Sequence, residues 1–124
     1  MSETQKSVTD WCQLHYPDQP VEQRLRDVFE EATELAASLN IASLEELLDV
    51  VRKSWEKSHA DLGDRSQTAG EIGDLRIATS WLASALNIDD QAALDDKMTI
   101  NRAKTIDTSQ ARLARKEKIF NPGV

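Results

Sequence analysis

Hydrophobic residues recur every three or four positions through most of the chain, which is the spacing of amphipathic α-helices. The stretch 21–40 shows it most clearly. Its apolar positions form one helical stripe: Val21, Leu25, Val28, Phe29, Ala32, Leu35, Ala36 and Leu39. No segment has the strict alternation of a half-buried strand. The pattern therefore predicts an all-α fold, a helical bundle.

The breaks between the periodic segments fall at proline and at capping residues. Pro17 and Pro20 end a first helix, because proline disfavours helical geometry in the residue before it. Ser43 stands three residues before Glu46, which is the spacing of a capping box. We expect about five helices, over 4–16, 21–40, 43–58, 68–87 and 89–104. Between them, 59–67 is expected to be a loop, and 105–124 a polar tail with at most a short helix over 111–118.

Length and composition place the chain among single-domain proteins. With 124 residues it is long enough for one hydrophobic core and too short for two, so we treat 1–124 as one domain. No apolar run reaches the length of a membrane span, and the start lacks the layout of a signal peptide. We therefore expect no membrane partner and a cytoplasmic location.

Charge and cysteine content exclude several classes of function. The lone Cys12 excludes an intramolecular disulfide and a zinc site with several thiolates. The net charge of −7, from 22 acids and 15 bases, argues against a broad nucleic-acid surface, which needs excess Lys and Arg. An acidic chain binds phosphates when metal ions bridge the like charges.

Acidic residues three apart occur five times, so their spacing alone decides little and their position on the helix matters more. At 100° per residue, Glu30 lies opposite the apolar stripe of 21–40, whereas Glu31 and Glu34 lie on its flank. Glu71 and Asp74 fall within the apolar arc of 68–87. A buried carboxylate costs several kcal/mol unless a cation compensates it. Basic side chains and a divalent metal with oxygen ligands are both open as that cation.

Polar donors form a stripe on the expected helix 89–104. Lys97, Asn101 and Lys104 stand at i, i+4 and i+7, beside Leu94 and Met98. Such a stripe suits phosphate oxygens. The alternative is a solvated helix face that pairs with neighbouring acids.

Three segments in order carry a resemblance to a known family. They are residues 30–35 (EEATEL), 71–75 (EIGDL) and 97–104 (KMTINRAK). As an ordered set of E-x-x-E, E-x-x-D and K-x-x-x-N-x-x-(R/K) elements, they resemble the MazG-like all-α NTP pyrophosphohydrolase superfamily. The resemblance covers about residues 21–104.

The resemblance implies an activity and a site. Glu31, Glu34, Glu71 and Asp74 would bind Mg²⁺, with Mn²⁺ as a substitute. The triphosphate contacts implied are Lys97, Asn101, Lys104 and, less directly, Arg102. The reaction would convert a nucleoside triphosphate, preferably deoxy, to the monophosphate and pyrophosphate, in nucleotide-pool house-cleaning. Glu34 is our choice for the general base. The family also implies a homodimer or a dimer of dimers, which completes the bundle.

Two features depart from the family pattern. The stretch between Glu34 and Glu71 is longer than usual, because it contains the helix 43–58, which would extend a dimer interface or cap the pocket. Lys104 stands where the family often has arginine, so a point charge replaces a bidentate fork.

Base recognition needs a flat apolar surface with a few polar groups. Trp11 and His15, four apart on the first helix, supply such groups together with Trp81. Their alternative is a place in the core. Two other functions remain open: a non-enzymatic acidic helical dimerisation module, and phosphoribosyl-ATP pyrophosphohydrolase within the same superfamily.

Overall fold

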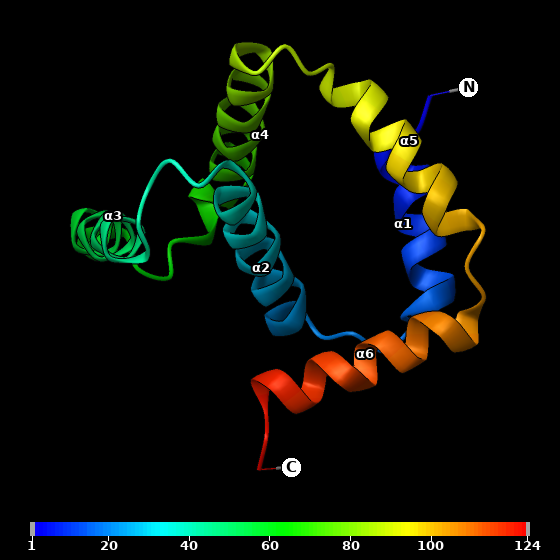
Figure 1. Cartoon of the computed structure of the whole chain (residues 1–124). Coiled ribbons are helices and arrows are strands. Elements are labelled where there is room, and N and C mark those ends of the chain that lie inside the picture. Colours follow the sequence, from blue (N-terminus) through cyan, green and yellow to red (C-terminus); the bar gives the residue numbers. More distant parts are fainter. Residues whose placement is uncertain (1, 124) are drawn as a thin grey trace. The chain divides into compact units, whose positions relative to one another are not determined.

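The computed structural model describes residues 2–123, and it is all-helical over that range, as the sequence predicts. Figure 1 shows the helices in chain order. The described residues contain six α-helices, two short 3-10 helices and no strand. Their bounds are α1 Gln5–His15, α2 Val21–Leu39, α3 Leu44–Lys57, η1 His59–Asp61, η2 Arg65–Gln67, α4 Thr68–Ala85, α5 Asp90–Arg102 and α6 Ile106–Phe120.

Side-chain caps explain where several of these helices begin. In each, a polar side chain accepts a hydrogen bond from the backbone N–H three residues further on, which otherwise has no partner in the helix. The caps are Thr4 for α1, Ser43 for α3, Asp89 for α5 and Thr105 for α6. The cap predicted at Ser43 is confirmed, with 3.1 Å between the Glu46 nitrogen and the Ser43 hydroxyl. At the other end of α2, Asn40 adopts the left-handed conformation, with φ of 51°, that commonly ends helices.

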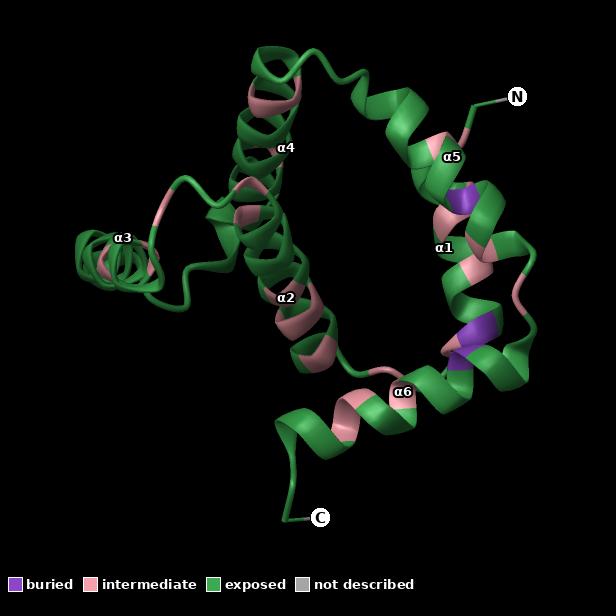
Figure 2. Cartoon of the chain, viewed as in Figure 1, coloured by how far each residue is buried: buried purple, intermediate pink, exposed green. Residues whose placement is uncertain are grey.

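The chain divides into two compact units, which we describe separately. The first comprises the residues up to 19 and those from 76 onward, and the second comprises residues 20–75. In the first unit α1 packs against α6. The buried positions of the described residues lie in this unit, at His15 on α1, Met98 on α5 and Ser109 on α6 (Figure 2). Met98, 4% exposed, is the one buried apolar side chain in the described range.

The second unit has no buried residue anywhere between 20 and 75. The apolar stripe expected on α2 is present but uncovered, at Val21, Leu25, Val28, Phe29 and Leu35. The expectation that this face is buried is therefore not met within the second unit itself. Because helices in water depend mainly on packing of their apolar faces, this unit requires a further surface against which to pack.

The C-terminal segment differs from the expected polar tail. Residues Ile106–Phe120 form α6, well beyond the short helix expected over 111–118. Ser109 and Gln110 hold it to the end of α1. The Ser109 hydroxyl lies 2.7 Å from Nδ1 of His15, and the Gln110 amide donates to the His15 carbonyl at 2.7 Å. Polar side chains make these contacts, so hydrophobic periodicity did not indicate the helix.

Candidate functional site

Three carboxylates gather on α2. Glu30, Glu31 and Glu34 each offer one oxygen, and these oxygens lie within 4.8 Å of one another. Glu30 is half-buried, while Glu31 and Glu34 are exposed. Hard cations such as Mg²⁺ take ligands of this kind. Exposed carboxylates also cluster on helices without a cation, so the group identifies possible ligands and not an occupant.

The position of Glu30 corrects the helical-face argument. That argument set Glu30 apart from Glu31 and Glu34, but the structure includes its carboxylate in the same group and buries it more than the other two. The physical reason is that Glu30 and Glu34 stand at i and i+4, one helical turn apart, where side chains meet.

Glu71 and Asp74 lie on the first half of α4 and are exposed. Among the described residues, neither belongs to the carboxylate group of α2. Their apolar neighbours Ile72 and Leu75 are exposed as well. The two acids thus do not point into a core of the second unit, because the apolar side chains beside them are exposed. Their joint use with Glu31 and Glu34 stays a prediction.

The donor stripe expected on α5 is partly assembled. The Lys104 ammonium donates to the side-chain oxygen of Asn101 at 3.3 Å, and the Asn101 amide lies 3.9 Å from the sulfur of Met98. Lys97, one turn earlier, is exposed. Asn101 and Lys104 are therefore held together, although α5 ends at Arg102 and Lys104 lies beyond it. The buried Met98 contacts the Asn101 amide, and the use of the stripe for phosphate stays a prediction.

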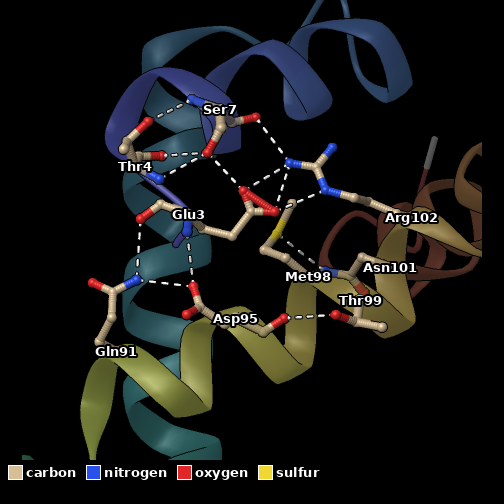
Figure 3. A network of polar contacts seen from close by, with 9 residues as sticks. All are labelled: Glu3, Thr4, Ser7, Gln91, Asp95, Met98, Thr99, Asn101 and Arg102. Carbon is tan, nitrogen blue, oxygen red and sulfur yellow. Dashed lines mark hydrogen bonds and ion pairs between the residues drawn. The ribbon is translucent and has the colours of Figure 1, made fainter. Parts of the chain in front are cut away.

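Arg102 has a partner that the sequence did not indicate. Its guanidinium forms a bidentate ion pair with the Glu3 carboxylate, with Nε 2.8 Å from Oε1 and Nη2 2.8 Å from Oε2 (Figure 3). The Ser7 hydroxyl donates to Oε2 of Glu3 at 2.6 Å. A phosphate contact by Arg102 would require this pair to open. Here Arg102 ties the N-terminal segment to α5.

The same segment is held at a second point. The backbone N–H of Glu3 donates to the Asp95 carboxylate at 2.8 Å, and the Gln91 amide donates both to that carboxylate and to the Glu3 carbonyl. The hydrogen bond from Ser7 and the ion pair with Arg102 lower the pKa of Glu3. The N–H of Glu3 and the amide of Gln91 lower the pKa of Asp95. Both carboxylates are thus stabilised in the charged form.

These two shifts predict a loss of stability in acid. A lowered pKa in the folded state means that the unfolded chain binds the proton more tightly, so the contribution is complete above the ordinary carboxyl pKa. It falls as the pH drops through the lowered values, below about pH 4. Hydrogen exchange of the first-helix amides, measured from pH 6 to pH 3, is expected to lose protection in this window.

A variant isolates the cause. Glu3→Gln is expected to show weaker protection at neutral pH and a smaller change on acidification. Asp10→Asn is a matched control, because Asp10 pairs with Lys6 on the exposed side of α1 at 2.7 Å. An acid profile of Glu3→Gln that superimposes on the wild type would contradict the assignment.

The aromatic residues expected to bind a base are placed differently from one another. Trp11 and His15 stack with ring centroids 4.1 Å apart and an interplanar angle of 21°. His15 is buried and bonded to Ser109. The indole N–H of Trp11 is buried, with no acceptor among the described residues. Trp81 is 78% exposed and is not part of the ring contacts of the described residues, which join Trp11, His15 and Tyr16.

Comparison with known proteins adds no assignment to this geometry. No family model matches the chain, and no curated protein or solved structure is significantly similar to it. Over residues 2–123, no helix has both the length and the apolar character needed to cross a bilayer. The family resemblance described above therefore stays a prediction from its motifs.

Proposed function

We propose that this protein is a Mg²⁺-dependent nucleoside triphosphate pyrophosphohydrolase of the MazG-like kind. The observation that carries the proposal is the carboxylate group on α2, where the E-x-x-E residues Glu31 and Glu34 offer oxygens within 4.8 Å of each other. Its donors are all carboxylate oxygens, which is the chemistry that Mg²⁺ prefers. The match between these carboxylate ligands and the preference of Mg²⁺ supports a metal-binding role for the E-x-x-E motif.

In the proposed site, Glu31 and Glu34 of α2 and Glu71 and Asp74 of α4 hold the metal. When bound, Mg²⁺ offsets the triphosphate charge and makes a coordinated water more acidic; Mn²⁺ would do the same. That role suits a chain with net charge −7, which on its own would repel a triphosphate.

The chain's own side chains carry out the rest of the proposed reaction. Glu34 accepts a proton from the water that attacks the α-phosphorus, and the bond between that phosphorus and the bridging oxygen breaks. The products are a nucleoside monophosphate and pyrophosphate. Lys97, Asn101 and Lys104 bind phosphate oxygens and stabilise the charge that develops on the leaving group. These donors are assigned to the same site as the carboxylates because the family motif contains both sets of residues.

The proposed substrate is a deoxynucleoside triphosphate, in a house-cleaning role. Trp81 offers an open ring on which a base can stack. Trp11 is already stacked on His15 and its indole N–H is buried, so a base carbonyl would reach that donor only if α1 moved. His15 is buried, so its proposed role is to position the Trp11 ring on which it stacks and not to contact the base itself.

The proposed active form is a homodimer or a dimer of dimers. Its support is the second unit, whose apolar faces are uncovered throughout residues 20–75. A second copy of the chain offers the same faces in return, as closed symmetric assemblies require.

The direct test offers purified protein each common NTP and dNTP with Mg²⁺, and measures pyrophosphate release. We expect release from one or more deoxy substrates, loss of release with a chelator, and recovery with Mn²⁺. Phosphoribosyl-ATP belongs in the same panel, because preferential turnover of that compound would assign the related activity of the superfamily instead. The absence of pyrophosphate release from every substrate of the panel would overturn the hydrolase proposal.

One observation favours a second function, a non-enzymatic helical dimerisation module. The uncovered apolar faces of the second unit suit association whether or not any metal binds. This alternative expects an assembly that forms equally well in a chelator and no pyrophosphate from any substrate. The substrate panel and a mass measurement with and without Mg²⁺ therefore separate the two functions.

A further inference from the structure

Helix α3 presents a continuous apolar seam that the rest of the second unit, residues 20–75, does not bury. The seam residues alternate in spacings of four, three and four, the d-a-d-a pattern of a two-helix contact. Their exposed fractions are 60% for Leu44, 50% for Leu48, 51% for Val51 and 64% for Trp55. Leaving a tryptophan and three branched aliphatic side chains in water is unfavourable, because the removal of apolar surface from water lowers the free energy. The apolar seam of α3 is therefore a candidate surface for contact with another helix.

The charges of α3 are arranged by halves. The acids Glu45, Glu46 and Asp49 occupy its first half, whereas the bases Arg52, Lys53 and Lys57 occupy its second half, with Glu56 the one exception. Glu45 and Arg52 stand seven residues apart, so both flank the seam on the same side. Lys53 points away from the seam and pairs with Asp49 at 2.8 Å, and the Arg52 guanidinium lies 4.0 Å from the same carboxylate.

We propose that α3 is a self-association helix, which pairs antiparallel with α3 of a second copy of this chain. In an antiparallel pair, Leu48 packs beside the partner's Val51, and Leu44 beside the partner's Trp55. Glu45 then lies opposite the partner's Arg52, and the two-fold axis repeats this ion pair further along the same flank of the seam. The partner's chemistry is thus that of α3 itself.

The alternative parallel pairing is electrostatically unfavourable. It would place the acidic half of one helix on the acidic half of the other, and leave Glu45 and Arg52 without opposite charges across the seam. Like charges in an interface disfavour that register. The division of charge therefore selects the antiparallel arrangement.

The size of the contact sets its role. With 14 residues, α3 is about 21 Å long, which gives less contact than the roughly 800 Å² per partner of a standard interface. The α3 pair accordingly adds to other contacts between chains. It is independent of the proposed activity, and its test measures mass and not turnover.

The test uses full-length charge variants followed by sedimentation velocity over a range of concentrations. Glu45→Arg and Arg52→Glu each set two like-charged pairs across the seam, and each is expected to weaken self-association about tenfold. An equimolar mixture of the two variants restores both ion pairs, since each chain then meets the opposite charge, and it is expected to regain the wild-type mass. Lys53→Glu, adjacent to Arg52 but on the far face, is the matched control.

Each outcome bears on the proposal. All positions are exposed, and unchanged helical circular dichroism verifies that the variants fold. A wild-type chain that stays monomeric, or variants that associate like the wild type, would overturn it; the seam would then meet another part of the chain or a different protein. Equal weakening by Lys53→Glu, or a mixture that fails to recover, would overturn the antiparallel register.

Discussion

Replacement of Glu34 by glutamine is expected to lower pyrophosphate release by roughly 10²–10³-fold, the scale of losing one preorganised charged group at a phosphoryl or acyl centre. The amide keeps the shape of the side chain but removes a carboxylate that we propose as both a metal ligand and the base. Asp74→Asn on α4 is expected to lose activity to a similar extent. Pyrophosphate release and titration calorimetry with Mn²⁺ measure the two effects.

The neighbouring Glu30 gives this experiment its control. The family motif does not include Glu30, so Glu30→Gln is expected to retain most of the activity, although its carboxylate lies with those of Glu31 and Glu34. All three variants should keep the helical circular dichroism of the wild type. Equal losses from Glu30→Gln and Glu34→Gln, with Asp74→Asn active, would mean that α2 alone binds the metal.

Dilution is expected to destabilise the protein. If a second copy covers the apolar faces of the second unit, the thermal midpoint rises with concentration, by mass action. Each tenfold dilution removes about 1.4 kcal/mol of association free energy. Leu25→Glu, in the middle of the α2 stripe and 59% exposed, is expected to lower the midpoint further, because a charge replaces an apolar side chain at the interface.

A variant on the other side of α2 serves as the control for this measurement. Ala37→Glu introduces the same charge on the face opposite the apolar stripe, and should leave both mass and midpoint close to those of the wild type. Calorimetry and sedimentation over a hundredfold range of concentration supply the data. A midpoint that does not depend on concentration, in a chain of monomeric mass, would contradict self-association.

Local features of this protein could be read from the sequence with good accuracy. The bounds of α2 and the cap at Ser43 were predicted because a stripe of apolar residues and a capping side chain act within one or two turns of the same helix. The stripe of Lys97, Asn101 and Lys104 stays a prediction, because α5 ends at Arg102 and Lys104, which donates to Asn101, lies beyond it.

Helical-face arguments were less reliable for burial. They assumed that an apolar face is covered, and so pointed Glu71 and Asp74 inward. In the chain itself α2, α3 and this part of α4 carry no buried residue. Periodicity shows which side of a helix seeks a partner, but it does not show where the partner is.

The sequence by itself determined that the protein is helical and where most of the helices begin, because these depend on neighbours a few positions apart. Only the tertiary structure decided that Arg102 pairs with Glu3, 99 positions away, and that His15 meets Ser109, 94 positions away. It also decided that the polar side chains of Ser109 and Gln110 join α6 to the end of α1. Such contacts depend on how the chain folds back on itself, which no local pattern records.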